Sequence, residues 1–307
     1  TTTSSGSAGA SYSTTGQISV QLKTDFFTPG NGLNFKGDWR YLDTSQPTYG
    51  LGSVDVTPSE YPMDFVMFRF YETANRRVRN TPFYVGAGYH YSRYQDIVDE
   101  RADLGEVTPY VTHMGGYPKK TTASGLSANV LYESRDNTIN ATTGAYWNAS
   151  ARFFADWLGG DDNWQTLWSD LRVYPHVPRG GRNVLSLWNY WWLTFGRAGY
   201  LDLPAIGWDT YGRGGRGYIQ GRIRGENQIY TEAEYRVTLT DDGLWGAVGF
   251  LSLTATTGKA GGPFQRGDPG GGVGLRVKFN KRTASNLTVD LAWGVNQPGG
   301  VFFAMQQ

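Results

Sequence analysis

The segment that most constrains the fold is an alternating strand that follows a loop rich in glycine and arginine. The segment begins at Gly212 and reads GRGGRGYIQGRIRGENQIYTEAEYR. One face of the strand carries Ile229, Thr231, Ala233, Tyr235 and Val237, and the other carries Tyr230, Glu232, Glu234 and Arg236. Charge on the enclosed face of a sheet suits a membrane β-barrel with a wet lumen better than a soluble sandwich. We therefore predict an all-β fold, a transmembrane antiparallel β-barrel with the long loop folded into its lumen.

The aromatic content also favours a barrel in a membrane. The 307 residues include 20 tyrosines, 15 phenylalanines and 11 tryptophans, yet the mean hydropathy is −0.45. A transmembrane barrel places Tyr and Trp in girdles at the two interfaces and fills its lumen with polar groups, which accounts for both values. The 42 glycines suit tight turns and bends in tilted strands.

Several classes of protein are excluded. The most apolar run, Val184–Phe195, is too short for a transmembrane helix but long enough for a strand, which crosses a bilayer in about 9–11 residues. Within this run Trp191 and Trp192 must face opposite sides, one towards lipid and one towards the lumen. The net charge of +1 predicts no nucleic-acid partner. With no cysteine, the chain offers neither disulfides nor thiolate metal sites.

Alternating segments recur along the whole chain, so we predict one barrel domain that spans residues 1–307. Counting by a period of two gives about fourteen strands: near Ser7–Ser13, then Gln17–Thr24, Gly32–Tyr41, Met63–Tyr71, Pro82–Tyr94, Ala123–Ser134, Gly144–Asp156, Asn163–Tyr174, Arg182–Phe195, Asn227–Thr240, Leu244–Thr254, Gly271–Asn280, Asn286–Gly294 and Val301–Gln306. The long connections are Asp43–Tyr61, Gln95–Thr122, Gly196–Glu226 and Thr256–Gly270. Long loops on one side and short turns on the other are typical of bacterial barrels.

Catalytic patterns are lacking, so we expect no enzyme, no catalytic residue, no metal and no cofactor. The three histidines, His90, His113 and His176, are scattered and show no metal-binding spacing. There is no G-x-S-x-G nucleophile elbow.

For Arg216 two hypotheses stay open: a latch in which the guanidinium binds Glu234 and Glu232 inside the lumen, or a fixed plug without a moving part.

With these segments laid out, the chain resembles the BamA/TamA (bacterial surface antigen) superfamily of outer-membrane assembly and translocation barrels. The family's (V/L)RG(F/Y) signature is matched by Arg216, Gly217 and Tyr218, and its GRxR continuation by Gly221, Arg222 and Arg224. Two hairpin motifs follow the same order, with Asp136, Asn137, Thr143 and Gly144 in one and Gly272, Gly274, Arg276 and Asp290 in the other. The resemblance covers roughly Ala123 to the end and, more loosely, Phe35–Tyr94.

Three departures from the family pattern lead to expectations. The family commonly holds the lumen arginine with acidic residues on the two strands after the loop. Glu234 fits the first position, but Ser252 stands at the second, so we expect fewer partners for Arg216. Soluble POTRA domains normally precede the barrel, so the resemblance implies a member without them or a barrel fragment. Members usually end on an aromatic residue, whereas this chain stops at Gln307. The family barrel has roughly sixteen strands, so we expect 14 to 16.

The resemblance implies a non-enzymatic barrel in the bacterial outer membrane that aids protein insertion or translocation. It would act alone or as the barrel subunit of a larger machine. The implied partners are outer-membrane lipid and lipopolysaccharide, client outer-membrane or secreted proteins, and periplasmic or lipoprotein subunits supplied in trans. Two alternatives stay open: a plugged pore or structural barrel for small solutes, and a membrane anchor for a patatin-like lipase that is absent from this chain.

Overall fold

The computed structural model describes residues 2–53, 59–175, 177, 182–259, 261–280 and 284–306. These contain fourteen strands: β1 (Ser5–Tyr12), β2 (Ile18–Phe27), β3 (Leu33–Ser45), β4 (Met63–Arg77), β5 (Phe83–Asp99), β6 (Thr121–Glu133), β7 (Gly144–Phe154), β8 (Trp164–Tyr174), β9 (Val184–Gly196), β10 (Asn227–Thr238), β11 (Trp245–Thr256), β12 (Asp268–Asn280), β13 (Ser285–Gly294) and β14 (Gly300–Gln306). The helices are short: α1 (Glu100–Asp103), α2 (Pro109–Met114) and the 3-10 turns η1 (Pro29–Asn31), η2 (Asp156–Leu158) and η3 (Tyr200–Asp202).

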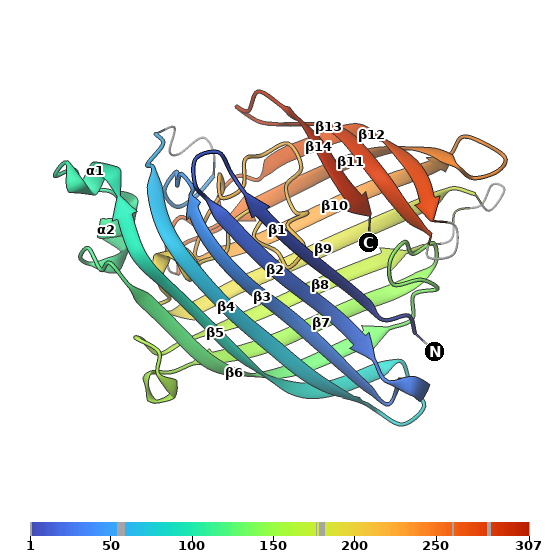
Figure 1. The fold of residues 1–307 in the computed structure, drawn as a ribbon, viewed down its shortest axis with the longest axis horizontal. Helices are drawn as coiled ribbons and strands as arrows, with labels where there is room; N and C mark the ends of the chain where they lie inside the picture. The colour runs from blue at the N-terminus through green and yellow to red at the C-terminus, as the bar shows by residue number, and fades with distance from the viewer. Residues whose placement is uncertain are drawn as a thin grey trace.

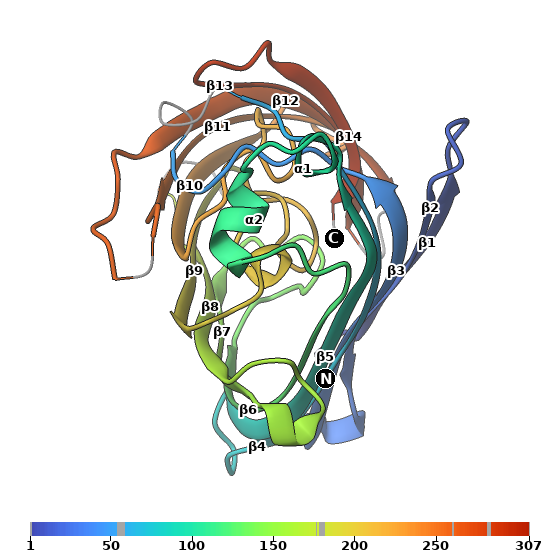
Figure 2. The same ribbon diagram turned by 90° about the vertical axis from the view of Figure 1, so that its left-hand side faces the viewer.

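The strands form one antiparallel sheet in which each strand pairs with the next along the chain, from β1 to β14. The sheet curls around a lumen, as the end-on view in Figure 2 shows. In the described part of the chain β1 pairs with β2 alone and β14 with β13 alone, so the barrel is not closed by a β1–β14 ladder. The prediction of an all-β antiparallel barrel is confirmed, and the strand count of the described residues lies at the lower end of the expected range.

The two faces of the sheet carry the predicted chemistry. In β10 the side chains of Glu232 and Glu234 are buried on the lumen side, whereas Tyr235 is exposed on the outer side. The same separation holds for Trp191, which is exposed, and Trp192, which is buried. An exposed apolar surface with polar groups inside is the inverse of a soluble domain and is typical of a barrel in lipid.

All long connections lie at one end of the sheet. Because consecutive strands are antiparallel, the links after β3, β5, β9 and β11 share an end, and these are the four long ones. Both α-helices lie in the link after β5, visible to the left in Figure 1. By the same alternation the start of β1 and the end of β14 lie at the opposite, short-turn end. The predicted asymmetry of long loops and short turns is confirmed.

The structure lengthens several of the predicted strands. The strand that was expected to end at Tyr41 continues to Ser45 as β3, and the one that was expected to end at Tyr71 continues to Arg77 as β4. The strand that was expected to end at Tyr94 continues to Asp99 as β5. Its register with β4 shifts near Val66, and Asp96 has a positive φ of 53°. A bulge of this kind inserts one residue and reverses the phase of the alternation, so a count by twos stops too early.

Among the described residues, no helix has the length and apolar character that a membrane-spanning helix requires.

Candidate functional site

The lumen is occupied by the connection between β9 and β10, residues 197–226, which we call the lumen loop. It appears as the gold trace inside the barrel in Figure 2. The loop pairs with itself, because Ile206 donates its amide to the carbonyl of Ile223 at 2.8 Å and accepts from Gly221 at 2.9 Å. Leu203 and Ile206 are buried. The loop is therefore a folded unit within the barrel.

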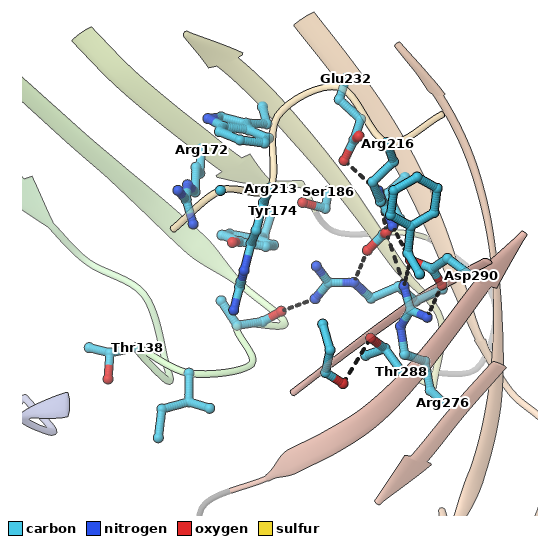
Figure 3. Close-up of a pocket in the computed structure, with 18 of the residues that line it drawn as sticks. Thr138, Arg172, Tyr174, Ser186, Arg213, Arg216, Glu232, Arg276, Thr288 and Asp290 are labelled. Atoms are coloured by element: carbon cyan, nitrogen blue, oxygen red, sulfur yellow. Dashed lines mark hydrogen bonds and ion pairs between the residues drawn. The ribbon is translucent and has the colours of Figure 1, made fainter. Parts of the chain in front are cut away.

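Arg216 makes contact with three carboxylates from two strands that are not neighbours. Its Nη2 donates to Glu232 and to Glu234 of β10, each at 2.7 Å, and its Nη1 donates to Asp290 of β13 at 2.8 Å. Figure 3 shows these ion pairs converging on one guanidinium. A planar guanidinium with several fixed donors suits this arrangement better than an ammonium group does.

The expectation that Arg216 would have fewer acidic partners is wrong. Ser252 on β11 is not one of the residues that bind it, but Asp290 supplies a third carboxylate from β13. On β11 the contact comes instead from Phe250, whose ring centroid lies 3.5 Å from the guanidinium carbon of Arg216. The arginine therefore stacks on an aromatic face while its edges bind carboxylates.

Two more arginines complete the charge network around Arg216. Arg236 donates through Nε to Glu234 at 2.7 Å. Arg276 pairs with Asp290 and lies 3.4 Å from Glu234. Three arginines thus face three carboxylates, counting Glu232, so the network is balanced in formal charge. Burial of charge is tolerated when every group is paired in this way.

Gly217 and Tyr218 fix the loop against the wall of the barrel. Gly217 has a φ of +98°, and a Cβ there would lie 2.6 Å from the carbonyl oxygen of Trp293. The hydroxyl of Tyr218 donates to the carbonyl of Pro269 at 2.5 Å and accepts from the amide of Val295 at 3.0 Å. The signature tripeptide therefore joins the loop to β12 and to the end of β13.

The GRxR continuation acts elsewhere. The guanidinium of Arg222 lies 4.4 Å from the ring centroid of Tyr49, in the connection after β3. Arg224 donates to the carbonyls of Tyr200 and Leu203, at 3.0 and 3.3 Å. Gly221 has a φ of +81°, which glycine adopts without strain. These residues hold the loop together and attach it to a neighbouring long loop, away from the carboxylates that bind Arg216.

The first hairpin motif closes the turn between β6 and β7. Asp136 accepts from the amides of Thr142 and Thr143 across the turn. Asn137 accepts from the amides of Ile139 and Asn140, and its bond to Ile139 has the spacing of an Asx turn. Gly144 follows with a φ of +91°. The same turn reaches the charge network, because Arg236 donates through Nη1 to the side chain of Asn140 at 3.1 Å and to the carbonyl of Ala141 at 3.3 Å.

The second hairpin motif makes room for the network. Gly274 of β12 pairs in register with Asp290 of β13, and Gly272 pairs with Ala292. A Cβ at Gly272 would lie 2.6 Å from the ring of Phe250, and one at Gly274 would lie 2.9 Å from Nη1 of Arg276. These glycines therefore leave the space that Phe250 and the Arg276–Asp290 pair occupy.

The network borders a lumen cavity of about 210 Å³. Its lining includes Arg216, Arg236, Arg276 and Glu234 (Figure 3). These charged side chains pair with one another, so their interactions anchor the lumen loop electrostatically. Over the described ranges, no group of three His, Asp or Glu side chains could hold a metal ion.

The two described histidines lie apart from the network. His90 contacts Ser127 at 2.8 Å, and His113 lies 3.3 Å from Glu226. His176 lies outside the described residues. In the lumen loop, burial raises the pKa of Asp202 to about 6, although a hydrogen bond from Ser92 at 2.7 Å opposes the rise. Asp202 is a titrating group that the sequence did not reveal, because no local pattern marks its burial.

Neither a family model nor a curated protein sequence matches this chain. The crystal structure of BamA from Haemophilus ducreyi lacking POTRA domains 1–3 matches with a TM-score of 0.59 and 15% identity, over 98% of this chain and 63% of that one. CdiB from Acinetobacter baumannii matches with a TM-score of 0.56 and 12% identity, over 94% of this chain and 48% of that one. The chain thus spans less than two thirds of either protein.

At these identities the similarity is one of fold, and it extends over nearly the whole chain. The resemblance predicted from the sequence is therefore confirmed at the level of fold: this chain has the architecture of a BamA-like β-barrel.

Proposed function

We propose that this chain is a non-enzymatic barrel of the bacterial outer membrane that aids the insertion or translocation of other proteins. The observation that carries the proposal is the open edge between β1 and β14, neither of which pairs with the other in the described residues. An unpaired strand edge presents free amides and carbonyls that an incoming extended chain can use.

The composition of β1 supports this role. Its sequence, SGSAGASY, has no large apolar side chain before Tyr12. Its eight residues are held by the ladder with β2. A strand of this kind offers its backbone to a client without a side-chain pattern that would restrict the client's sequence. The client would add by β-augmentation, with main-chain hydrogen bonds as the source of affinity.

The lumen loop and its charge network would hold the barrel wall in shape while the edge is engaged. Arg216 links β10 to β13 across the strands that lead to β14. Lipopolysaccharide and outer-membrane lipid would surround the apolar face, and periplasmic or lipoprotein subunits in trans would deliver clients to the short-turn end.

The test is photocrosslinking from the edge strand. A photoreactive amino acid at Ala8 of β1, which is exposed, should capture newly made outer-membrane proteins in living cells. The matched control is the same group at Leu167 of β8, which is also exposed but lies in the middle of the sheet. Equal capture of clients at both positions, or none at Ala8, would contradict the proposal.

A plugged pore is the second candidate, and the cavities favour it specifically. A further cavity of about 410 Å³ lies beside the one of about 210 Å³, and Gly212, Arg213 and Arg216 line both. The lumen loop therefore separates them. If the chain is a plugged pore, the Arg216→Ala variant should have a higher single-channel conductance and more frequent channel openings than the wild type. Unchanged conductance would remove this candidate.

The third alternative, an anchor for a patatin-like lipase supplied by another chain, stays a prediction. Purification of the tagged barrel from native outer membranes in mild detergent, followed by mass spectrometry, separates it from the others. Periplasmic or lipoprotein subunits in stoichiometric amounts support an assembly or secretion machine, whereas a lipase subunit supports the anchor. A barrel that is purified alone supports the pore.

A further inference from the structure

A third cavity in the lumen shares no lining residue with the cavity of about 210 Å³ beside the Arg216 network. It has a volume of about 70 Å³. The barrel wall contributes Tyr71, His90, Asn129 and Arg152 to its lining, and the lumen loop contributes Tyr211. A single buried water needs about 10–15 Å³ of such space, so the cavity can hold a larger occupant.

Arg152 enters this cavity without a carboxylate partner. Its residue is 8% exposed, and its guanidinium carbon lies 5.1 Å from the ring centroid of Trp168 and 5.4 Å from that of Tyr71. Its hydrogen bond is a long one, from Nε to the hydroxyl of Ser150 at 3.4 Å. No ion pair to Arg152 occurs among the described residues. Arginine cannot lose its proton in a protein, so the buried charge persists.

A second arginine lies against the same aromatic ring; Asp38 and Asp202 favour its charge, but neither forms an ion pair with it among the described residues. Arg69 is 3% exposed, and its guanidinium carbon is 4.8 Å from the ring centroid of Tyr71. Its Nε is buried and has no hydrogen-bond partner. Two like charges thus converge on Tyr71. Isolated buried charges are costly, and a counter-ion reduces the cost.

The carboxylates at this cavity are already engaged. Asp38 binds Arg40 through both oxygens, at 2.6 and 2.7 Å. Asp170 binds Arg172 in the same way, at 2.9 and 2.8 Å. The ammonium of Lys36, which also lines the cavity, is paired with Asp25. After these pairs are counted, the charge of Arg152 is left over.

Two neutral groups add unused hydrogen-bonding capacity to the same cavity. Nδ2 of Asn129 is buried without a partner, and the residue is 5% exposed. Nδ1 of His90 is also buried without a partner, and the residue is 2% exposed. When Ser127 donates to Nε2 of His90, at 2.8 Å, the Nδ1 atom carries the hydrogen and becomes a donor. A cation that is surrounded by unsatisfied hydrogen-bond donors is suited to binding an anion.

We propose that this cavity binds a small free oxyanion, of the size of inorganic phosphate, with Arg152 as the charged anchor and Asn129 as a neutral donor. The occupant must be small because Thr210 and Tyr211 of the lumen loop form one side of the cavity. A bound anion therefore contacts both the wall and the loop, and it stabilises the docked loop. This site is independent of the edge between β1 and β14, so it stands whether or not the proposed function does.

The experiment titrates inorganic phosphate into the purified full-length chain in detergent at constant ionic strength, in a buffer whose other anions are bulky. Isothermal titration calorimetry gives the affinity, and ³¹P line broadening reports the bound state. We expect saturable binding with one site per barrel. Arg152→Gln should weaken it at least tenfold, because a charged hydrogen-bond partner is lost. Asn129→Ala should weaken it less.

The matched control is Arg182→Gln, which removes one positive charge from an exposed pair with Asp241 and should leave phosphate affinity unchanged. Asn129→Ala removes no charge and serves if Arg152→Gln does not fold. The proposal is overturned if phosphate shows no saturable binding, since the cavity then holds water only. It is also overturned if Arg182→Gln weakens binding as much as Arg152→Gln, because that is a general charge effect.

Discussion

Arg216 and Asp290 lie 74 positions apart in the sequence, and the Nη1–Oδ2 distance between them is 2.8 Å. This single contact joins the lumen loop to β13, the strand that carries β14 at the open edge. Because Glu232 and Glu234 bind the same guanidinium from β10, the loop connects two parts of the wall that share no ladder. The loop is therefore a structural tie across the lumen.

Replacement of Arg216 should release the lumen loop while leaving the strands paired. Arg216→Ala leaves three carboxylates without their shared cation, and we expect a loss of about 3–5 kcal/mol in the free energy of loop docking. Arg216→Lys should recover only part of it, because an ammonium lacks the planar set of donors. Hydrogen exchange of residues 197–226, compared with that of the strands, measures the loss. Equal protection in wild type and Arg216→Ala would show that the ion pairs do not hold the loop.

Gly217 and Gly221 allow a comparison of two positive-φ glycines. A Cβ at Gly217 would press on the backbone of Trp293, whereas one at Gly221 would lie 3.5 Å from its nearest neighbour, the side chain of Gln46. Gly221→Ala should cost about 1 kcal/mol from the left-handed backbone alone. Gly217→Ala should cost clearly more, because the main chains must also separate. Limited proteolysis of the loop in both variants tests the order, and a reversed order would contradict the contact.

Asp202 should make loop docking depend on pH. Its pKa is raised from 3.8 to about 6, chiefly by burial, while Arg69 and Arg224 oppose the rise. The docked state therefore favours the protonated carboxyl. Its stability is greatest below about pH 4, and it falls as the pH rises to about 6, by about 3 kcal/mol in total.

The measurement for Asp202 is the midpoint of thermal unfolding at pH 4.5 and at pH 7 in wild type and in Asp202→Asn. The variant mimics the protonated carboxyl, so its gain in stability over the wild type at pH 4.5 should be only about a third of its gain at pH 7. Other carboxylates titrate in both proteins and cancel in the comparison. An equal gain at both pH values would show that Asp202 does not titrate in this range.

Arg236 and Asn140 should be energetically coupled, although they belong to β10 and to the turn between β6 and β7. Their hydrogen bond is 3.1 Å long and joins residues that lie 96 positions apart in the sequence. A double-mutant cycle with Arg236→Gln and Asn140→Ala should give a coupling of about 0.5–3 kcal/mol in unfolding free energy. The matched cycle of Arg182→Gln with Asn140→Ala, whose residues share no contact in the structure, should be additive. A coupling near zero in the first cycle would mean that the bond does not contribute.

The strands were predictable because alternation is local. The segment from Asn227 shows its two faces in the sequence, and β10 has them in the structure. The pair between Arg216 and Glu234 was also predicted, because the resemblance to the family places an acidic residue for the lumen arginine on the strand after the loop. The bulge near Asp96 was not, because one inserted residue reverses the period that a strand prediction counts.

Contacts across the lumen could not be predicted from the sequence. Asp290 was visible as part of a hairpin motif, but its place beside Arg216 depends on how far the sheet curls and where the loop enters. The ring of Phe250 under the guanidinium and the unpaired charge of Arg152 depend on the same geometry. A single sequence carries no signal for the meeting of strands that are not neighbours.

The small side chains of β1 lower the free-energy cost of separating this strand from β2. Removing this strand from β2 breaks main-chain hydrogen bonds but uncovers almost no apolar side-chain area, since Ser, Gly and Ala fill seven of its eight positions. Hydrophobic surface sets most of the cost of separating packed elements. Strand β1 can therefore separate from β2 and pair with it again while the apolar outer surface of the barrel stays intact, so another strand can take its place at this edge.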